Sequence, residues 1–137
     1  MLNIAIISLL LFSGCAGLSD YDVDLPGKYS IVRTSARNVF IAPKEGEGRW
    51  GSPIIPTEVT EIAWDENYIM AKQVELKEDP ESENGYEIPD EESYHFWIVE
   101  IETGKATGPL DEQSFMEKRS ELKIADDIIL KDVYDIK

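Results

Sequence analysis

The sequence predicts a single α+β domain, a meandering antiparallel sheet with one helix near the C-terminus. Three observations support this prediction. Short stretches rich in β-branched and aromatic residues recur between turn residues, as antiparallel strands do. One later stretch changes to the apolar spacing of a helix. The length of 137 residues suits one domain behind an export segment. A small closed barrel is the alternative arrangement of the strands.

The first fourteen residues carry no Asp, Glu, Lys, Arg or His. A helix that crosses a bilayer takes about 20 apolar residues, so this run is too short to span a membrane. It has the length of a secretion-signal core, and small residues follow it as they do before a cleavage site. We therefore expect residues 1–14 to be a signal peptide that is cut between Gly14 and Cys15. A buried N-terminal element and an uncleaved signal anchor are the alternatives.

The stretch "LFSGC", which ends at the only cysteine of the chain, resembles the lipobox of bacterial lipoproteins. In that family the peptidase cuts just before the cysteine, whose sulfur carries a diacylglyceryl group. Ser13 and Gly14 match the small residues of the lipobox, whereas Phe12 stands where the family prefers an aliphatic residue. No Lys or Arg precedes the apolar run. The resemblance implies that Cys15 carries the diacylglyceryl group and palmitate. These lipids would anchor the protein to the extracytoplasmic side of the cell membrane.

Residues 15–27 lack apolar periodicity and predict a tether, so the folded domain is expected over residues 28–137. Alternation in "KYSIVRTS" predicts a first strand, and "NVFIAP" predicts a second one that follows a short hairpin loop. The Gly and Pro residues of the following "KEGEGRWGSPIIP" indicate a loop.

The clearest strand signal is a hairpin with strands near residues 58–64 and 68–76, around turn residues 65–67. The segment that follows, residues 77–93, is acidic, contains two prolines and has few apolar residues. That composition predicts an exposed, mobile loop.

The next stretch, "YHFWIVE", is apolar on both faces and predicts a central strand that is covered on both sides. Gly104 allows a tight turn because glycine adopts positive φ without steric cost. A short partner strand is expected after this turn, ending at Pro109.

Helical spacing of apolar residues predicts a helix from about residue 112 to residue 122. Asp111 is the expected N-cap, because its carboxylate can accept a hydrogen bond from the free N–H groups of the first turn. Phe115 and Arg119 lie on the face expected to pack, with the arginine stem against apolar surface. The tail, residues 126–137, is compatible with a strand or a helix.

The charge balance limits the kinds of partner. The chain has 28 acidic and 13 basic residues, for a net charge of −15. This charge argues against binding nucleic acid or lying flat on anionic lipid, and it permits basic partners and cations. The single cysteine excludes an intramolecular disulfide.

Two motif-like stretches lack the context that their chemistry requires. "GEGRWG" spells the glycine pattern of a dinucleotide loop, but two prolines follow where the loop needs a helix. Asp20, Asp22 and Asp24 begin like a helix–loop–helix calcium site, but the glycine and the bidentate glutamate of such a site are missing. We expect no metal ion and no cofactor.

Other candidate residues also favour simple roles. His95 is the only histidine and lies in an apolar strand, which indicates a structural side chain. Catalytic carboxylates need fixed positions and separated pKa values, and the acidic clusters lie in a stretch expected to be a mobile loop. No catalytic residue is assigned. Trp50, in a Gly-rich loop, is the best candidate for an exposed aromatic that contacts a ligand.

Three stretches together resemble a family of small uncharacterised lipoproteins of Gram-positive bacteria, a domain of unknown function. These stretches are "GCAGLSDYDVDLPGKYSIVRTSARNVFIAP", "IPTEVTEIAWDENYIMAKQ" and "FWIVEIETGKATGPLDEQSFMEKRSEL". The resemblance implies membrane anchoring through Cys15 and supplies no catalytic residues.

Taken together, these features predict a lipid-anchored extracytoplasmic lipoprotein that is a non-catalytic binding or interaction module for an unknown protein or envelope ligand. Two alternatives remain open. One is a cell-envelope hydrolase that uses carboxylates, and the other is an acidic, immunity-like inhibitor of a basic partner. A cleft that unites two buried carboxylates favours the hydrolase, and an exposed aromatic or acidic patch favours the binding module.

Overall fold

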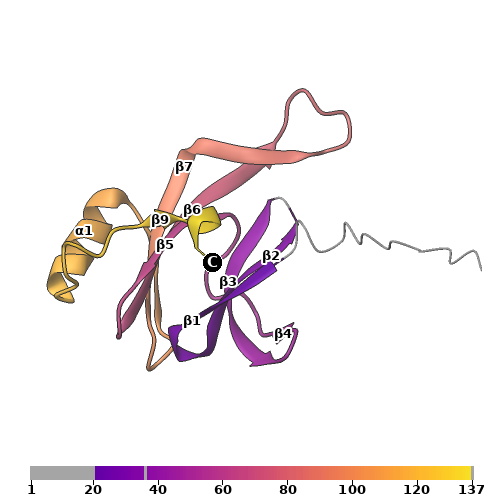
Figure 1. Cartoon of the computed structure of the whole chain (residues 1–137). Coiled ribbons are helices and arrows are strands. Elements are labelled where there is room, and N and C mark those ends of the chain that lie inside the picture. The colour runs from indigo at the N-terminus through magenta and orange to yellow at the C-terminus, as the bar shows by residue number, and fades with distance from the viewer. Residues whose placement is uncertain (1–20, 36, 137) are drawn as a thin grey trace, which may run out of the picture.

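Alternating buried and exposed side chains organise the chain into two antiparallel sheets and one helix (Figure 1). The computed structural model describes residues 21–35 and 37–136. Its four-stranded sheet has the order β1-β2-β3-β4 and consists of β1 (Tyr21–Leu25), β2 (Tyr29–Ser35), β3 (Asn38–Gly46) and β4 (Arg49–Trp50). The single turn η2 (Pro26–Lys28) connects β1 to β2.

The second sheet has five strands in the order β8-β7-β6-β5-β9. It consists of β5 (Val59–Trp64), β6 (Tyr68–Glu78), β7 (Glu87–Glu100), β8 (Ala106–Leu110) and β9 (Lys131–Asp132). The prediction that β7 is a central strand is confirmed, because β6 and β8 pair with its two edges. The two sheets do not close into a barrel. No helix in the described part of the chain is long and apolar enough to span a membrane.

The alternation along β6 and β7 separates two apolar layers. Ile69 and Val99 pack toward the four-stranded sheet, together with Ile31 and Ile41 of that sheet. Their neighbours Met70, Phe96 and Ile98 pack on the opposite face, against Phe115 and Ile124. The five-stranded sheet is therefore the middle layer, between the four-stranded sheet and the helix (Figure 1).

Helix α1 (Glu112–Glu121) begins where the sequence predicts it. The carboxylate of Asp111 accepts a hydrogen bond from the Ser114 N–H at 2.7 Å, so the predicted N-cap is confirmed. Phe115 stacks on Phe96 with ring centroids 4.6 Å apart. Arg119 is buried and donates to the carbonyls of Ala125 and Ile128, each at 2.8 Å, which fixes the chain that returns from the helix.

The β6–β7 hairpin extends beyond the rest of its sheet (Figure 1). β5 pairs with β6 only as far as Val59 opposite Gln73, with one further pair between Glu58 and Val74. β8 pairs with the other end of β7. The projecting part, residues 75–92, is called the arm below. The arm bends away from the sheet where the register shifts between Val74 and Leu76.

The structure corrects several boundaries. Residues 21–25 belong to edge strand β1 and not to a tether, because they form a complete antiparallel ladder with β2. The loop expected after β3 contains a short hairpin of β3 with β4. Of the acidic loop expected over residues 77–93, residues 79–86 form a loop, whereas residues 77–78 and 87–93 belong to the strands of the arm. β8 continues past Pro109 to Leu110, and the tail forms the two-residue β9 and the single turn η3 (Val133–Asp135).

Candidate functional site

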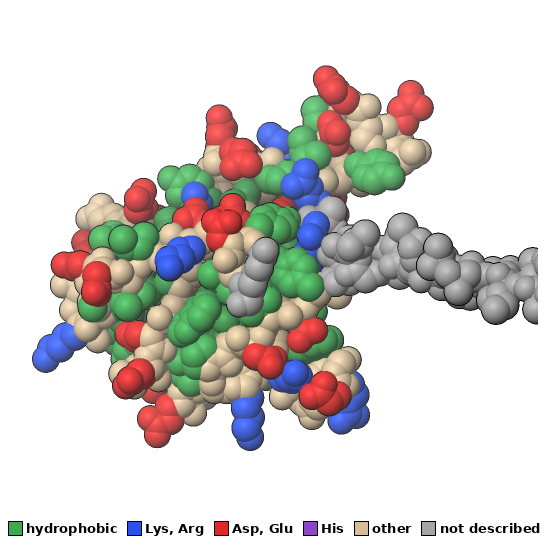
Figure 2. Space-filling model, viewed as in Figure 1, with side chains coloured by type: hydrophobic (Ala, Val, Ile, Leu, Met, Phe, Trp, Pro, Cys, Tyr) green, Lys and Arg blue, Asp and Glu red, His purple; other side chains and the backbone are tan. Residues whose placement is uncertain are grey.

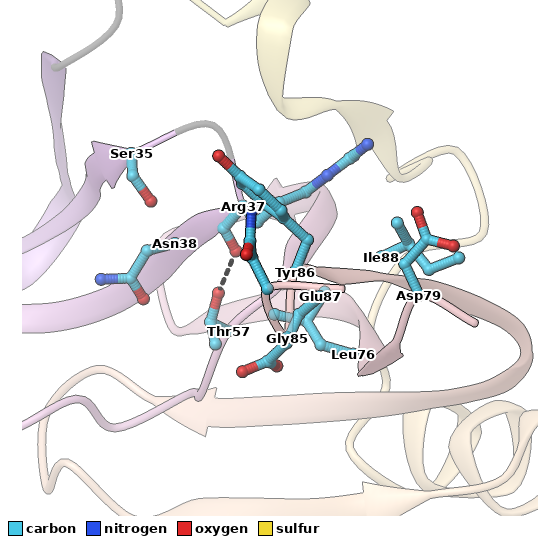
Figure 3. Close-up of a pocket in the computed structure, with 11 residues that line it drawn as sticks. Ser35, Arg37, Asn38, Thr57, Leu76, Asp79, Gly85, Tyr86, Glu87 and Ile88 are labelled. Carbon is cyan, nitrogen blue, oxygen red and sulfur yellow. Dashed lines mark hydrogen bonds between the residues drawn. The ribbon is translucent and has the colours of Figure 1, made fainter. Parts of the chain in front are cut away.

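A groove with a volume of about 890 Å³ lies between the β2–β3 turn and the arm (Figure 3). It is open to solvent on one side. The end of β2, the start of β3 and the residue before Glu58 form one wall, through Ser35, Arg37, Asn38 and Thr57. The arm forms the other wall, through Leu76, Asp79 and residues 84–88.

Thr57 fixes the polar wall of the groove to both sheets. Its hydroxyl donates to the Arg37 carbonyl at 2.7 Å and accepts from the Val39 N–H at 3.0 Å. Its carbonyl accepts from Gln73 Nε2 at 3.0 Å, and Gln73 Oε1 accepts from Trp97 Nε1 at the same distance. This continuous hydrogen-bond network connects β3 to β7, so the wall is preformed.

Glu58, directly after Thr57, is a buried acid beside this wall. Only 5% of the residue is exposed. Its Oε1 lies 3.9 Å from Arg37 Nη1, and its buried Oε2 has no hydrogen-bond partner among the described residues. Burial raises the pKa of Glu58, and Glu91 adds to the increase, while Arg37 and Arg33 oppose it. Because this pair is long, the five donors of the half-exposed Arg37 guanidinium make no hydrogen bond to a described residue.

The arm supplies the apolar surface of the groove. Leu76 and Ile88 are half-buried, whereas Tyr86 is 69% exposed. The Tyr86 side chain is directed from the arm toward the β2–β3 turn that carries Arg37 (Figure 3). Exposed tyrosines of this kind combine a large contact area with a polar end, and they are common anchors at binding sites.

The arm also concentrates negative charge. Residues 75–92 include nine of the acidic residues of the chain and a single lysine. That lysine, Lys77, already pairs with Asp90 at 3.8 Å, and Glu75 lies 3.1 Å from His95. Acidic side chains cover the outer end of the arm (Figure 2). Within the arm itself the negative charge is therefore mostly unpaired, and the cation of the groove, Arg37, lies on the opposite wall.

The residues singled out in the sequence lie elsewhere. Gly14 and Cys15 are outside the described residues. Trp50 is on β4 and half-buried, with its indole N–H buried and unbonded among the described residues, so the expectation of an exposed aromatic is wrong. It does not line the groove. His95 is only partly buried and is bonded to Glu75.

Two carboxylates of the calcium-like stretch, Asp22 and Asp24, lie on β1. Asp24 lies 3.2 Å from the Lys44 ammonium group and accepts from the Ser30 hydroxyl. Asp22 and Asp24 are exposed, and Asp20 is outside the described part. Across residues 21–35 and 37–136, no cluster of three His, Cys, Asp or Glu side chains could hold a metal ion.

The sequence does not predict the groove, because the residues that line it come from three separate segments of the chain. One local signal was present: Asn84-Gly85 is the dipeptide typical of a tight hairpin turn. Gly85 has φ of +71°, and the Asp79 N–H donates to the Tyr86 carbonyl at 2.7 Å across the end of the arm. The strands end at Glu78 and resume at Glu87, so the dipeptide lies within a longer loop and not in a two-residue turn. It indicates a turn in the chain, but it does not indicate which surface the hairpin faces.

Comparison with known proteins places the chain in a family without an assigned activity. No curated protein and no solved structure matches this chain significantly. A family model described as "Protein of unknown function (DUF3997)" matches residues 26–134, which include the five-stranded sheet, strands β2 to β4 of the other sheet, the helix and the groove. The chain therefore belongs to the DUF3997 family.

Proposed function

We propose that this protein is a lipid-anchored, extracytoplasmic binding module of Gram-positive type, and that it binds its ligand in the groove between the β2–β3 turn and the arm. The groove carries the proposal: it joins an apolar wall that includes the exposed Tyr86 to a polar wall held in place by Thr57. Ligand sites commonly combine apolar surface with a few fixed polar groups. The role is non-catalytic.

The proposed anchor would hold the groove near the membrane. β1 begins at Tyr21, which is opposite Arg33 in the β1–β2 ladder. Arg33 is two residues from Ser35 at the groove wall. Five residues lie between Cys15 and Tyr21, and the six Cα–Cα steps from one to the other span at most about 20 Å. A lipid on Cys15 would therefore keep the ligand site close to the membrane surface.

The anchor is tested with Cys15→Ala. The wild-type protein is expected in the membrane fraction, with the mass of residues 15–137 plus the lipid. The variant is expected to be unprocessed or released into the medium, because the modified sulfur is missing. An unchanged mass and an unchanged distribution between the fractions would refute the lipid anchor.

The groove is tested by chemical crosslinking on intact cells, followed by mass spectrometry. We expect wild-type protein and Met116→Ala to give the same adduct and Tyr86→Ala to lose most of it. Met116 is a matched control because it is also an exposed apolar residue, 53% exposed, but lies on α1. Equal adduct yields from all three proteins would argue against the groove as the ligand site.

The hydrolase alternative draws support from Glu58, a buried acid whose pKa is raised as that of a general acid often is. It ranks second because a two-carboxylate mechanism needs a second acid in a fixed position, and the acid whose charge acts on Glu58, Glu91, is exposed. Glu58 is the single buried acidic residue among those the structure describes. Turnover of cell-wall fragments that disappears in Glu58→Gln would establish the hydrolase and overturn the non-catalytic role.

A further inference from the structure

We propose that the groove accepts an extended, cationic polypeptide segment, which adds as a strand to the free edge of β6 at Leu76 and Glu78. This inference rests on the proposed function of the groove and specifies its ligand. The geometry of three backbone segments leads to it: the end of the β5–β6 ladder, the pairing within the arm, and the path of the chain before β5.

The β5–β6 ladder ends with a doubly bonded pair. The Glu58 N–H donates to the Val74 carbonyl at 3.1 Å, and the Val74 N–H donates to the Glu58 carbonyl at 2.8 Å. Val74 thus directs both backbone groups toward β5. Because backbone direction alternates along a strand, Leu76 and Glu78 direct theirs to the same side.

Hydrogen bonds within the arm independently show which residues of β6 direct their backbone groups toward β7. The Asp79 N–H donates to the Tyr86 carbonyl at 2.7 Å, so odd-numbered residues of this part of β6 face β7. Leu76 lies opposite Pro89, which has no N–H to donate, as expected for a pair that does not exchange hydrogen bonds. The backbone groups of Leu76 and Glu78 therefore point away from β7, toward the β5 side.

No strand in the described part of the chain fills the position beside them, because the chain enters β5 from the other sheet. Ile55 forms a bridge with Ile41 of β3, so the residues before Thr57 belong with the four-stranded sheet. Among the described residues, no backbone group pairs with β6 on this side beyond Val74. Thr57 and Leu76 both line the groove, which therefore begins where the β5–β6 ladder ends.

The side chains around this edge select the kind of strand. Ile88 lies opposite Lys77, so Ile88 and Leu76 are on opposite faces of the arm. Alternate residues of an added strand would lie on the face of Ile88, and the residues between them on the face of Leu76. Asp79 and Glu87 also line the groove, and neither forms an ion pair with a described residue. With the rest of the acidic arm they favour lysine or arginine at the remaining positions of the ligand. Arg37 on the opposite wall can donate to ligand carbonyls.

The probe is a short synthetic peptide that alternates lysine and valine, titrated into the full-length protein in detergent. Two control peptides have the same length: one carries N-methyl groups on alternate amides, and the other has glutamate in place of lysine. The matched protein variants are Glu78→Pro and Glu78→Ala. Both remove the exposed carboxylate, but only proline removes the N–H at the open edge. Circular dichroism verifies that both variants are folded.

The lysine–valine peptide is expected to bind and to slow hydrogen exchange at the amides of Leu76 and Glu78. Glu78→Pro should weaken binding about tenfold relative to Glu78→Ala, because a backbone hydrogen bond to the ligand is lost. Each control peptide should bind much more weakly than the probe. Equal binding of the N-methylated peptide, or equal affinity of the two variants, would overturn strand addition.

Preference for the glutamate peptide would overturn the cationic ligand class. A different result would overturn the proposed function itself: a yield of crosslinked adduct on cells that is the same for wild type and Tyr86→Ala. If crosslinking at the groove persists while the lysine–valine peptide does not bind, the strand-addition proposal is wrong and the groove remains the binding site.

Discussion

Glu58 is a buried acid that lies beside Arg37 of the groove, and its burial lowers the stability of the fold when the carboxyl group ionises. Its carboxylate is buried, one oxygen has no hydrogen-bond partner among the described residues, and its cationic neighbour Arg37 is 3.9 Å away. A buried charge that is weakly paired favours the protonated form of the acid. Glu58 therefore holds Arg37 at the groove at the expense of some stability when it ionises.

The free energy of unfolding should depend on pH because of the raised pKa of Glu58. Because the pKa of Glu58 is raised from 4.5, the folded state binds its proton more tightly than the unfolded chain does. The stabilisation from this proton is complete below the unfolded pKa and is lost as pH rises through the folded pKa. Glu58→Gln should therefore gain stability relative to wild type across this window, by about 1.4 kcal/mol for each pH unit between the two pKa values.

Urea denaturation between about pH 4 and pH 7 measures the difference in the free energy of unfolding between wild type and Glu58→Gln. Parallel stability curves would contradict this assignment.

The burial of Glu58 could not be predicted from its surroundings in the sequence. Glu58 and Glu61 both lie in the same strand-forming stretch, but Glu61 is partly exposed and pairs with Lys72. The cation beside Glu58, Arg37, belongs to the β2–β3 turn, about twenty residues away in the chain. Side-chain environments of this kind depend on contacts between distant segments, which local periodicity does not report.

At the scale of the element, α1 was predictable and the arm was not. The helix has local signals, namely the Asp111 cap and the spacing of Phe115 and Arg119, and each has the predicted role. The arm has the composition of a mobile loop, and residues 79–86 do connect its strands as a loop, but residues 76–78 pair with residues 87–89 at its base. Strand pairing can order an acidic segment that buries few side chains, because the stabilisation comes largely from the backbone ladder and from cross-strand contacts.

Arg119 should be the most sensitive position of the helix. Arg119→Met keeps a long apolar stem but removes the donors to the carbonyls of Ala125 and Ile128. Leaving these carbonyls unbonded should lower the free energy of unfolding by about 2–4 kcal/mol. Lys118→Met is the matched control: its ammonium group makes a surface pair with Glu121 at 3.4 Å, and such pairs contribute less than about 1 kcal/mol. Equal losses in urea denaturation would show that Arg119 has no special role.

At the scale of the whole molecule, the packing of the two sheets depends on a close approach at Gly27. This residue has φ of +75° in the turn between β1 and β2, and an added Cβ would collide with Ile101 at the end of β7. Antiparallel sheets and one helix were predictable from the alternation of side chains. How the strands divide between two sheets was not, because this division depends on contacts such as that of Gly27 with Ile101.

Gly27→Ala should therefore destabilise the protein by about 2 kcal/mol or more, through both the positive φ and the collision. Gly48→Ala isolates the backbone contribution, because Gly48 has φ of +67° but no atom within 4 Å of the added Cβ. Its cost should be about 1 kcal/mol. Thermal unfolding of the two variants compares them directly, and equal melting temperatures would contradict close packing of the two sheets at Gly27.

The measurement that tests the central claim most directly is photo-crosslinking in intact cells, with a photoreactive amino acid in place of Tyr86 in one protein and of Met116 in another. The account predicts a discrete adduct from position 86, located within the groove by mass spectrometry and absent from position 116. It also predicts that an excess of the lysine–valine peptide reduces this adduct. Adducts of equal yield from both positions, or from position 116 alone, would contradict a ligand-binding groove between the β2–β3 turn and the arm.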